Sequence, residues 1–329
     1  MEHFIDFSNC TVNPLKWFGG ANGNKISINY QGIDYMLKFE SHPHQHPESS
    51  YTNSWISEYV ACHILQSLGI PAQETLLGCY RGKNVVACRD FETNGDRLQD
   101  FASLKNTIVD SERSGYGTEL SEIILTFESQ QLLPANEVSS FFWDVFVADA
   151  LVGNFDRHNG NWGFLTNVQT GMLKLAPVYD CGSCLYPQLS DAAMADVLAN
   201  PEKMEERIYV FPTSAIKESG KKINYMDFLS QTQVRDCLEA VIRIVPRVKL
   251  ERLYAIVEET PALTTVQRTF YKEMLAQRKE KILDRALSHA LEVLPQKKLL
   301  QERIADAGDR AAKQNHSRIS GSVPELERE

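Results

Sequence analysis

The first ninety residues read as strands and turns with one helix. Apolar and polar side chains alternate from Ile26 to Tyr30, Gln31-Gly32 is a turn signal, and Ile33–Phe39 resumes strand-like residues, which predicts a β-hairpin. Apolar residues recur at helical spacing from Asn53 to Leu68, and Gly69-Ile70-Pro71 ends that pattern. Two more short strands are expected around a turn, at Leu76–Leu77 and Val85–Cys88 with the turn at Arg81-Gly82.

The pattern changes after residue 90. Residues 91–117 are polar and irregular, which is typical of a linker and the start of a second lobe. A wide apolar helical face runs from Val138 to Val152 and predicts a strong helix. A short hairpin is expected at Gly163–Leu165 and Met172–Leu175, and two or three further helices between Tyr225 and Leu294.

These patterns predict an α+β protein with two lobes. A small β-rich lobe covers residues 1–90, and a mostly helical lobe covers residues 91–300. Residues 301–329 are charged and nearly free of large apolar groups from Gly308 onward, so we expect a mobile tail. A chain of 329 residues exceeds the usual size of one hydrophobic core, and 43% hydrophobic residues can fill two.

Charge and cysteine content exclude several classes of protein. The 34 basic and 43 acidic residues give a formal net charge of −9, which argues against a protein that coats nucleic acid. No stretch approaches the ~20 apolar residues of a membrane helix, and the first residues lack the pattern of a signal peptide. Seven cysteines in a chain too large to need disulfides favour reduced thiols and a cytoplasmic location. Nothing in the sequence indicates an oligomeric state.

The most informative stretch is Gly153–Leu165, where Asp156 is followed five positions later by Asn161. This spacing, in a loop between a predicted helix and a predicted strand, matches the catalytic loop of kinases. There the aspartate orients the acceptor hydroxyl and the asparagine holds a magnesium ion, because phosphoryl transfer depends mainly on positioning. Taken alone, Asp156 could equally cap a helix or pair with Arg157.

A second aspartate follows the expected hairpin, in Tyr179-Asp180-Cys181-Gly182. An aspartate at the end of a strand, with glycine two positions later, is similar to the D-F-G element of kinases, whose aspartate ligates magnesium. Taken alone, this stretch could be a plain turn. The order of loop, hairpin and second aspartate favours a phosphotransferase that uses ATP and Mg²⁺.

Residues of the first lobe could bind the nucleotide. Lys38 lies on the strand where kinases place the phosphate-binding lysine, and Glu58 on the next helix would be its ion-pair partner. A solvated lysine and a solvated glutamate are the alternatives. A glycine-rich turn can bring backbone N–H groups against phosphate oxygens, although a plain hairpin turn explains it equally well. That turn comprises Gly19, Gly20, Ala21, Asn22, Gly23, Asn24 and Lys25. Order along the chain also places an adenine-binding hinge at Arg89, Asp90 and Phe91.

These residues resemble the HipA-like serine/threonine kinases. The resemblance rests on Asn154–His158 with Asn161, on Tyr179-Asp180, on Lys38 and on the Glu58 helix. The opening Ile5-Asp6-Phe7 and the glycine-rich turn are most similar to a compact secreted kinase of that family. The likeness runs from about residue 5 to residue 295.

The resemblance implies a bilobal protein-kinase-like fold, ATP and Mg²⁺ as cofactors, transfer to serine or threonine, and autophosphorylation. Asp156 would be the catalytic aspartate, with Arg157 and His158 as supporting loop residues. Asn161 and Asp180 would hold the metal. Because no extra domain precedes the glycine-rich turn, an antitoxin or DNA partnership of the HipA kind is not implied. Likeness to a secreted kinase also leaves export without a signal peptide open.

Other interpretations compete with this one. The D-R-H-x-x-N pattern also occurs in phosphoinositide kinases, although an acidic chain offers little to hold a membrane. A pseudokinase or binding module is a further alternative. His42, His44 and His46 are expected on a surface connection rather than at a metal. We expect reduced, partly buried thiols at Cys181 and Cys184, and a solvated loop at Lys217, Lys221 and Lys222.

Overall fold

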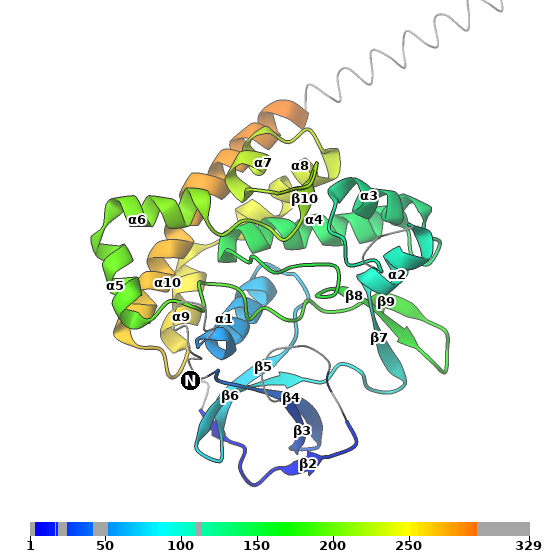
Figure 1. Ribbon diagram of the computed structural model, residues 1–329, viewed down its shortest axis with the longest axis vertical. Helices are drawn as coiled ribbons and strands as arrows, with labels where there is room; N and C mark the ends of the chain where they lie inside the picture. The colour runs from blue at the N-terminus through cyan, green and yellow to red at the C-terminus, as the bar shows by residue number, and fades with distance from the viewer. Residues whose placement is uncertain (1–3, 17, 19–24, 42–51, 110–113, 295–329) are drawn as a thin grey trace, which may run out of the picture.

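The described part of the chain forms an α+β fold in which a sheet at one end adjoins a larger body of helices (Figure 1). The computed structural model describes residues 4–16, 18, 25–41, 52–109 and 114–294. Three predicted features lie outside these residues: Gly19–Asn24 of the glycine-rich turn, the histidine tract and the tail at residues 301–329.

Six strands form the sheet, in the order β1-β5-β6-β4-β3-β2. Neighbouring strands are antiparallel, except that β1 and β5 are parallel. The strands are β1 (Ile5–Asp6), β2 (Thr11–Asn13), β3 (Lys25–Tyr30), β4 (Ile33–Phe39), β5 (Thr75–Tyr80) and β6 (Lys83–Arg89). The predicted hairpin β3–β4 is confirmed, and β5 and β6 are longer than expected.

The two faces of the sheet carry different cores. Val85 and Ala87 of β6 pack with Leu37 in one cluster, whereas Val86 and Cys88 belong to the larger core that includes helix α1 (Ser54–Ser67). Successive side chains of a strand point to opposite faces. Lys38 follows Leu37 on β4, so it points to the face that α1 covers.

Helix α1 occupies the expected position and is almost wholly buried between the sheet and the helical body (Figure 1). The other helices are α2 (Phe101–Ile108), α3 (Leu120–Ser129), α4 (Ala135–Val152), α5 (Asp191–Ala199), α6 (Pro201–Glu205), α7 (Tyr225–Gln231), α8 (Arg235–Ile244), α9 (Leu250–Glu259) and α10 (Thr265–Arg278). Helix α4 confirms the strong helix predicted there. The expectation of two or three helices between Tyr225 and Leu294 is wrong. The described residues there form the four helices α7 to α10, which are separated by short connections.

A second, three-stranded sheet consists of β7 (Asp96–Asp100), β8 (Gly163–Asn167) and β9 (Leu173–Leu175). Strands β8 and β9 are the predicted hairpin. The sequence predicts a linker and the start of the second lobe at residues 91–117. The linker part of this expectation is wrong, because the segment contains β7 and α2. The polar sequence of β7 becomes a strand through its long-range pairing with β8.

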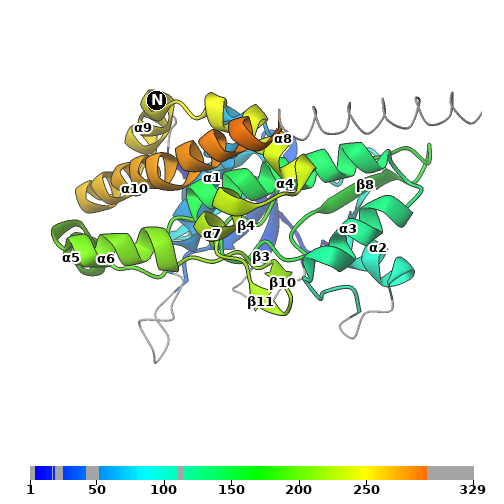
Figure 2. The same ribbon diagram turned by 90° about the horizontal axis from the view of Figure 1, so that it is seen from above.

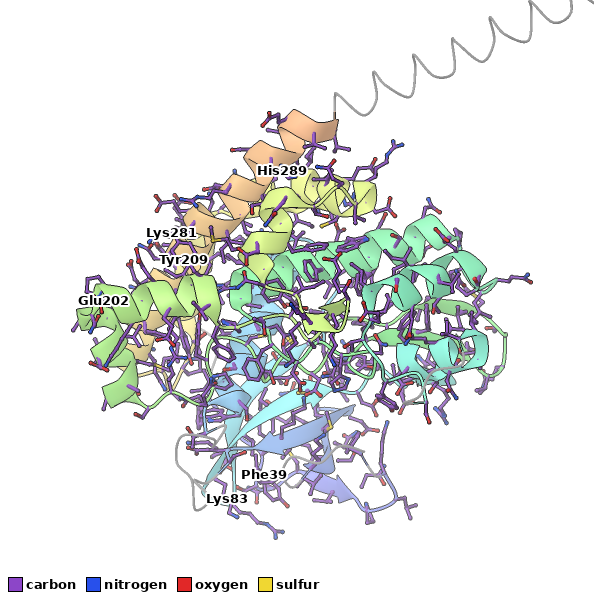
Figure 3. All side chains as sticks on the ribbon, turned by 45° about the horizontal axis from the view of Figure 1, so that its top comes forward. Phe39, Lys83, Glu202, Tyr209, Lys281 and His289 are labelled. Atoms are coloured by element: carbon purple, nitrogen blue, oxygen red, sulfur yellow. The ribbon has the colours of Figure 1, made fainter. Side chains whose placement is uncertain are left out.

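The lysine-rich segment expected as a loop is a small antiparallel hairpin, β10 (Lys217–Glu218) and β11 (Lys221–Lys222). Phe39 and Lys83 lie at the end of the molecule that carries the six-stranded sheet, and His289 lies at the other end (Figure 3). Among the described helices, none combines the length and apolar character needed to cross a membrane.

Candidate active site

The loop that carries Asp156 begins where α4 ends. Gly153 closes the helix in the left-handed conformation, with φ 64°. Asn154 then turns the chain: its Nδ2 donates to Asp149 at 2.9 Å, and its Oδ1 accepts from the Asp156 N–H at 3.0 Å. Both Asn154 and Asp149 are buried. The start of the loop is therefore held by side-chain hydrogen bonds from inside the helical body.

Asp156 itself is exposed to solvent, which suits a carboxylate that receives an acceptor from outside. Neighbouring protein atoms still displace water from it, and this desolvation raises the pKa of Asp156. Electrostatic interactions with His158 and Lys222 lower the pKa of Asp156, whereas the negative charge of Asp180 raises it. The two aspartates identified in the sequence therefore lie within electrostatic range of each other.

Arg157 points into the protein rather than towards Asp156. Its Nε lies 3.1 Å from Oδ2 of Asp149, and Nη1 donates to the carbonyl groups of Asn161 and Tyr179. The side chains of Arg157 and Asp149 are 5% and 1% exposed. Arg157 thus ties the loop to the segment that carries Asp180, and its position is a supporting one.

His158 and Asn161 shape the rest of the loop. The Gly160 N–H donates to Nδ1 of His158 at 3.0 Å. Nδ2 of Asn161 donates to the Asp156 carbonyl at 2.8 Å, which leaves its Oδ1 as the acceptor atom of the amide. An amide oxygen is a ligand that Mg²⁺ prefers in proteins.

Lys38, Glu58 and Asp180 meet in one cluster. Nζ of Lys38 lies 2.8 Å from Oε2 of Glu58 and 2.9 Å from Oδ1 of Asp180. Burial would lower the pKa of Lys38, but the charges of Asp180 and Glu58 outweigh it and raise that pKa. The ion pair between Lys38 and Glu58 expected from the sequence is present, and Asp180 joins it.

Asp180 has φ 56°, a conformation uncommon for a residue other than glycine. It follows an isolated bridge at Val178 and not a full strand, which corrects the expectation from the sequence. The charge of Lys38 lowers the pKa of Asp180 to about 2, against an ordinary value of 3.8. Its side chain is 46% exposed, so the carboxylate remains open to a ligand.

The residues after Asp180 lie against Glu58. The Cys181 N–H donates to Oε1 of Glu58 at 3.0 Å. A Cβ added at Gly182 would lie 3.3 Å from Oε2 of Glu58, so glycine permits this close approach. The glycine of the D-x-G pattern therefore has a packing reason in this chain.

The predicted hinge residues differ in their surroundings. Arg89 ends β6 and pairs with the exposed Glu74 at 2.7 Å. Asp90 is nearly buried and forms an ion pair with Lys16, and the ring of Phe91 lies 5.8 Å from that of Tyr179. Lys25, from the glycine-rich turn, lies directly opposite Lys38 in the register of β3 and β4. Burial and the positive charge of Lys38 lower the pKa of Lys25.

All seven cysteines are free, and Cys181 and Cys184 are fully rather than partly buried. Ligand atoms of Glu58, Cys62 and Cys181 lie within 4.8 Å of one another. Two cations oppose a metal ion at this cluster, because Lys38 contacts Glu58 and Arg157 lies 3.3 Å from the Cys181 sulfur.

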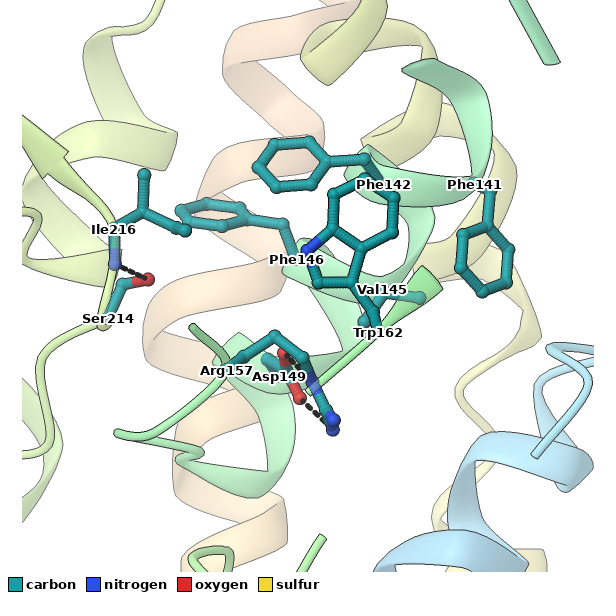
Figure 4. A pocket seen from close by; sticks show the side chains of 9 residues that line it. All are labelled: Phe141, Phe142, Val145, Phe146, Asp149, Arg157, Trp162, Ser214 and Ile216. Atoms are coloured by element: carbon teal, nitrogen blue, oxygen red, sulfur yellow. Dashed lines mark hydrogen bonds and ion pairs between the residues drawn. The ribbon is translucent and has the colours of Figure 1, made fainter. Parts of the chain in front are cut away.

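Asp149 was not identified from the sequence, although it is the buried carboxylate that holds the loop. An acidic residue on the otherwise apolar face of α4 is the signal that could have found it. Figure 4 shows Asp149 and Arg157 at one side of a pocket whose other walls are mainly apolar side chains of α4, with Trp162, Ser214 and Ile216. This apolar pocket does not include Lys38, Glu58 or Asp180.

Comparisons with known proteins identify the family of this chain. Residues 17–248 match the family described as the HipA-like C-terminal domain. The chain is 49% identical over 306 residues to the serine/threonine-protein kinase CtkA of Helicobacter pylori strain J99. This match covers 93% of the chain and 94% of that protein.

Similar solved structures include the following two. The crystal structure of the H. pylori proinflammatory kinase CtkA has a TM-score of 0.85 and 49% identity, and the match covers 89% of this chain and 99% of that one. A Shewanella oneidensis HipA in complex with HipB and operator DNA has a TM-score of 0.51 and 14% identity, over 87% of this chain and 70% of that one, which shows a shared fold. The chain therefore belongs to the HipA-like C-terminal domain family and has the kinase fold of its homologue CtkA.

Proposed function

We propose that this chain, a serine/threonine protein kinase like CtkA, transfers the γ-phosphoryl group of ATP to a protein hydroxyl at the site around Asp156. One observation carries the residue assignments. Lys38 contacts both Glu58 and Asp180, so three residues far apart in the sequence form the cluster expected of a kinase.

Asn161 and Asp180 would hold Mg²⁺. The donor set fits, because an amide oxygen and an open carboxylate are hard oxygen ligands. When bound, the ion would neutralise charge on the phosphates. Lys38 would bind phosphate oxygens, and Glu58 holds the ammonium in place for that task. The glycine-rich turn and the Arg89–Phe91 segment remain the expected contacts of phosphates and adenine.

Asp156 would orient the acceptor hydroxyl and accept its proton. The carboxylate is exposed, while Asn154 and Asn161 fix the backbone on either side of it. Preorganised polar groups of this kind supply much of an enzyme's rate enhancement, since they need no rearrangement during the reaction. The acceptor is a serine or threonine of a protein, including this chain itself. The relative named as a protein kinase favours a protein over a lipid acceptor, and nucleic acid is not expected as a partner.

The test is phosphate transfer by the Asp156→Asn variant. With γ-labelled ATP, Mg²⁺ and a serine-containing acceptor protein, we expect a loss of ~10²- to 10⁴-fold in kcat, while ATP still binds. Asp227→Asn, an exposed aspartate on α7, is the matched control. Transfer by Asp156→Asn at the parent rate would show that another group performs this role.

The location we propose is the cytoplasm, supported by seven free cysteines, five of them buried. Thiols persist in a reducing compartment. Export of the folded kinase is the alternative, and cell fractionation separates the two.

A further inference from the structure

The hairpin β10–β11 carries an uncompensated pair of positive charges. Lys217 lies directly opposite Lys222 in the register of the two strands, so both side chains are on the same face of the hairpin. Like charges in this arrangement destabilise a strand pair. On the other face, Lys221 lies opposite Glu218, which offsets its charge. Within the ranges that the structure describes, neither Lys217 nor Lys222 forms an ion pair with a carboxylate.

The hairpin is anchored by its backbone. The Lys217 N–H donates to the Thr118 carbonyl at 2.8 Å, and the Thr118 hydroxyl donates to the Ala215 carbonyl at 2.8 Å. The carboxylate of Glu119 accepts from the N–H groups of the turn, including Gly220 at 3.0 Å. Glu119 therefore serves the turn, and among the described residues the side chains of Lys217 and Lys222 form no hydrogen bond that holds the hairpin.

The anchoring segments also bind the loop of Asp156. Nδ2 of Asn159 donates to the carbonyl of Gly117 at 2.7 Å, one residue before Thr118. On the other side of the hairpin, the Tyr225 hydroxyl donates to the Asn154 carbonyl at 2.6 Å. The hairpin is thus tied to the loop through both of its ends. It projects from the helical body on the lower side of Figure 2.

Electrostatics agree with this placement. The charge of Lys222 reaches Asp156 and lowers its pKa, against the larger effect of desolvation by neighbouring protein atoms, which raises it. Lys222 is exposed, and Lys217 is half-buried. In a chain with a formal net charge of −9, a projecting pair of lysines, one of which interacts electrostatically with Asp156, needs a chemical reason.

We propose that the face formed by Lys217 and Lys222 binds acidic residues that flank the acceptor serine or threonine. The kinase then prefers acidic protein segments as substrates. This inference rests on the proposed role of Asp156. An acidic segment would relieve the repulsion between the two ammonium groups and would place its hydroxyl next to the loop. Because these contacts are the same before and during transfer, they act on KM rather than on kcat.

The experiment compares three peptides of equal length with the full chain, ATP and Mg²⁺. Each has one serine, flanked by glutamates, by glutamines or by lysines. We expect kcat/KM to be about 2- to 30-fold higher for the glutamate peptide than for the glutamine peptide, as for two exposed ion pairs, and lowest for the lysine peptide. The preference should appear in KM and should shrink in high salt.

Variants assign the preference to this face. The double variant Lys217→Gln, Lys222→Gln should lose the preference for the glutamate peptide. The double variant Lys217→Glu, Lys222→Glu should prefer the lysine peptide instead. Lys221→Gln, on the other face of the same hairpin, is the matched control and should keep it. Thermal unfolding checks that all variants fold. An equal loss from Lys221→Gln would overturn the assignment.

The remaining outcomes separate this inference from the proposed function. If the parent labels itself but transfers equally to the glutamate and glutamine peptides, or to neither, the inference is wrong and the kinase activity stands. If it labels neither itself nor any acceptor and Asp156→Asn changes nothing, the proposed function fails first. If the label appears in phosphatidylinositol vesicles and not in peptides, and the double variant loses this lipid labelling, the inference is wrong and the lysine face binds a lipid surface.

Discussion

Lys38 lies 2.9 Å from Oδ1 of Asp180, although 142 positions separate the two residues in the chain. The same ammonium lies 2.8 Å from Glu58. One cation therefore joins strand β4, helix α1 and the segment that follows β9. The residues expected to bind phosphate and metal are brought together by the fold itself.

Replacing Lys38 by alanine tests this cluster. Lys38→Ala should lower phosphate transfer by at least ~10²-fold, because a fixed positive group opposite the phosphates is lost. The measurement is the rate of label transfer from γ-labelled ATP. Lys83→Ala, an exposed lysine on β6 of the same sheet, should transfer at the parent rate. Equal rates for the two variants would remove Lys38 from the site.

Asp180→Asn should change the metal dependence. The amide keeps the shape of the carboxylate but lacks its charge, so the Mg²⁺ concentration for half-maximal transfer should rise by at least ~10-fold. A titration with Mg²⁺ at fixed ATP measures it. Asp96→Asn is the control, because Asp96 pairs with Lys174 at 2.8 Å in the separate sheet. An unchanged Mg²⁺ midpoint for Asp180→Asn would mean that another group binds the ion.

Much of the fold could be predicted where local pattern decides it. The β3–β4 hairpin, α1 and α4 each have a regular period and a clear stop signal. Strand β7 could not be predicted, since its sequence is polar and only the pairing with β8 makes it a strand. The helices after Tyr225 were undercounted because their connections are as short as a turn.

The candidate site shows the same division. Asp156, Asn161 and Asp180 follow from spacing in one part of the chain. The role of Asp149 could not be predicted from spacing. It becomes apparent only from the contacts of Asp149 with Asn154 and Arg157, and these contacts exist only in the folded protein. The orientation of Arg157 away from the solvent has the same origin.

The link between Lys38 and Asp180 should also make stability depend on pH. The charge of Lys38 lowers the pKa of Asp180 to about 2 in the folded protein, from 3.8. The folded state then favours the ionised carboxylate. The contribution of ionised Asp180 to the free energy of unfolding is therefore complete above about pH 4 and is lost as the pH falls towards 2. Because the side chain of Asp180 is 46% exposed, solvent screening reduces this contribution to about 1 kcal/mol.

Urea unfolding of the parent and of Asp180→Asn at pH 5, 4 and 3 measures this contribution. The difference in free energy of unfolding between the two proteins should shrink as the pH falls. A difference that stays constant over this range would show that Lys38 does not stabilise the ionised form of Asp180.

The ion pair of Asp149 and Arg157 should matter most for stability. Asp149→Ala leaves a buried guanidinium without its carboxylate and should lower the free energy of unfolding by about 3–5 kcal/mol. Asp196→Ala breaks an exposed pair with Lys203 and should cost at most about 1 kcal/mol. The double variant Asp149→Leu, Arg157→Met should lose less stability than Asp149→Ala, because it removes both buried charges. Urea unfolding compares the three, and a smaller loss for Asp149→Ala than for Asp196→Ala would contradict the buried pair as the main support of the loop.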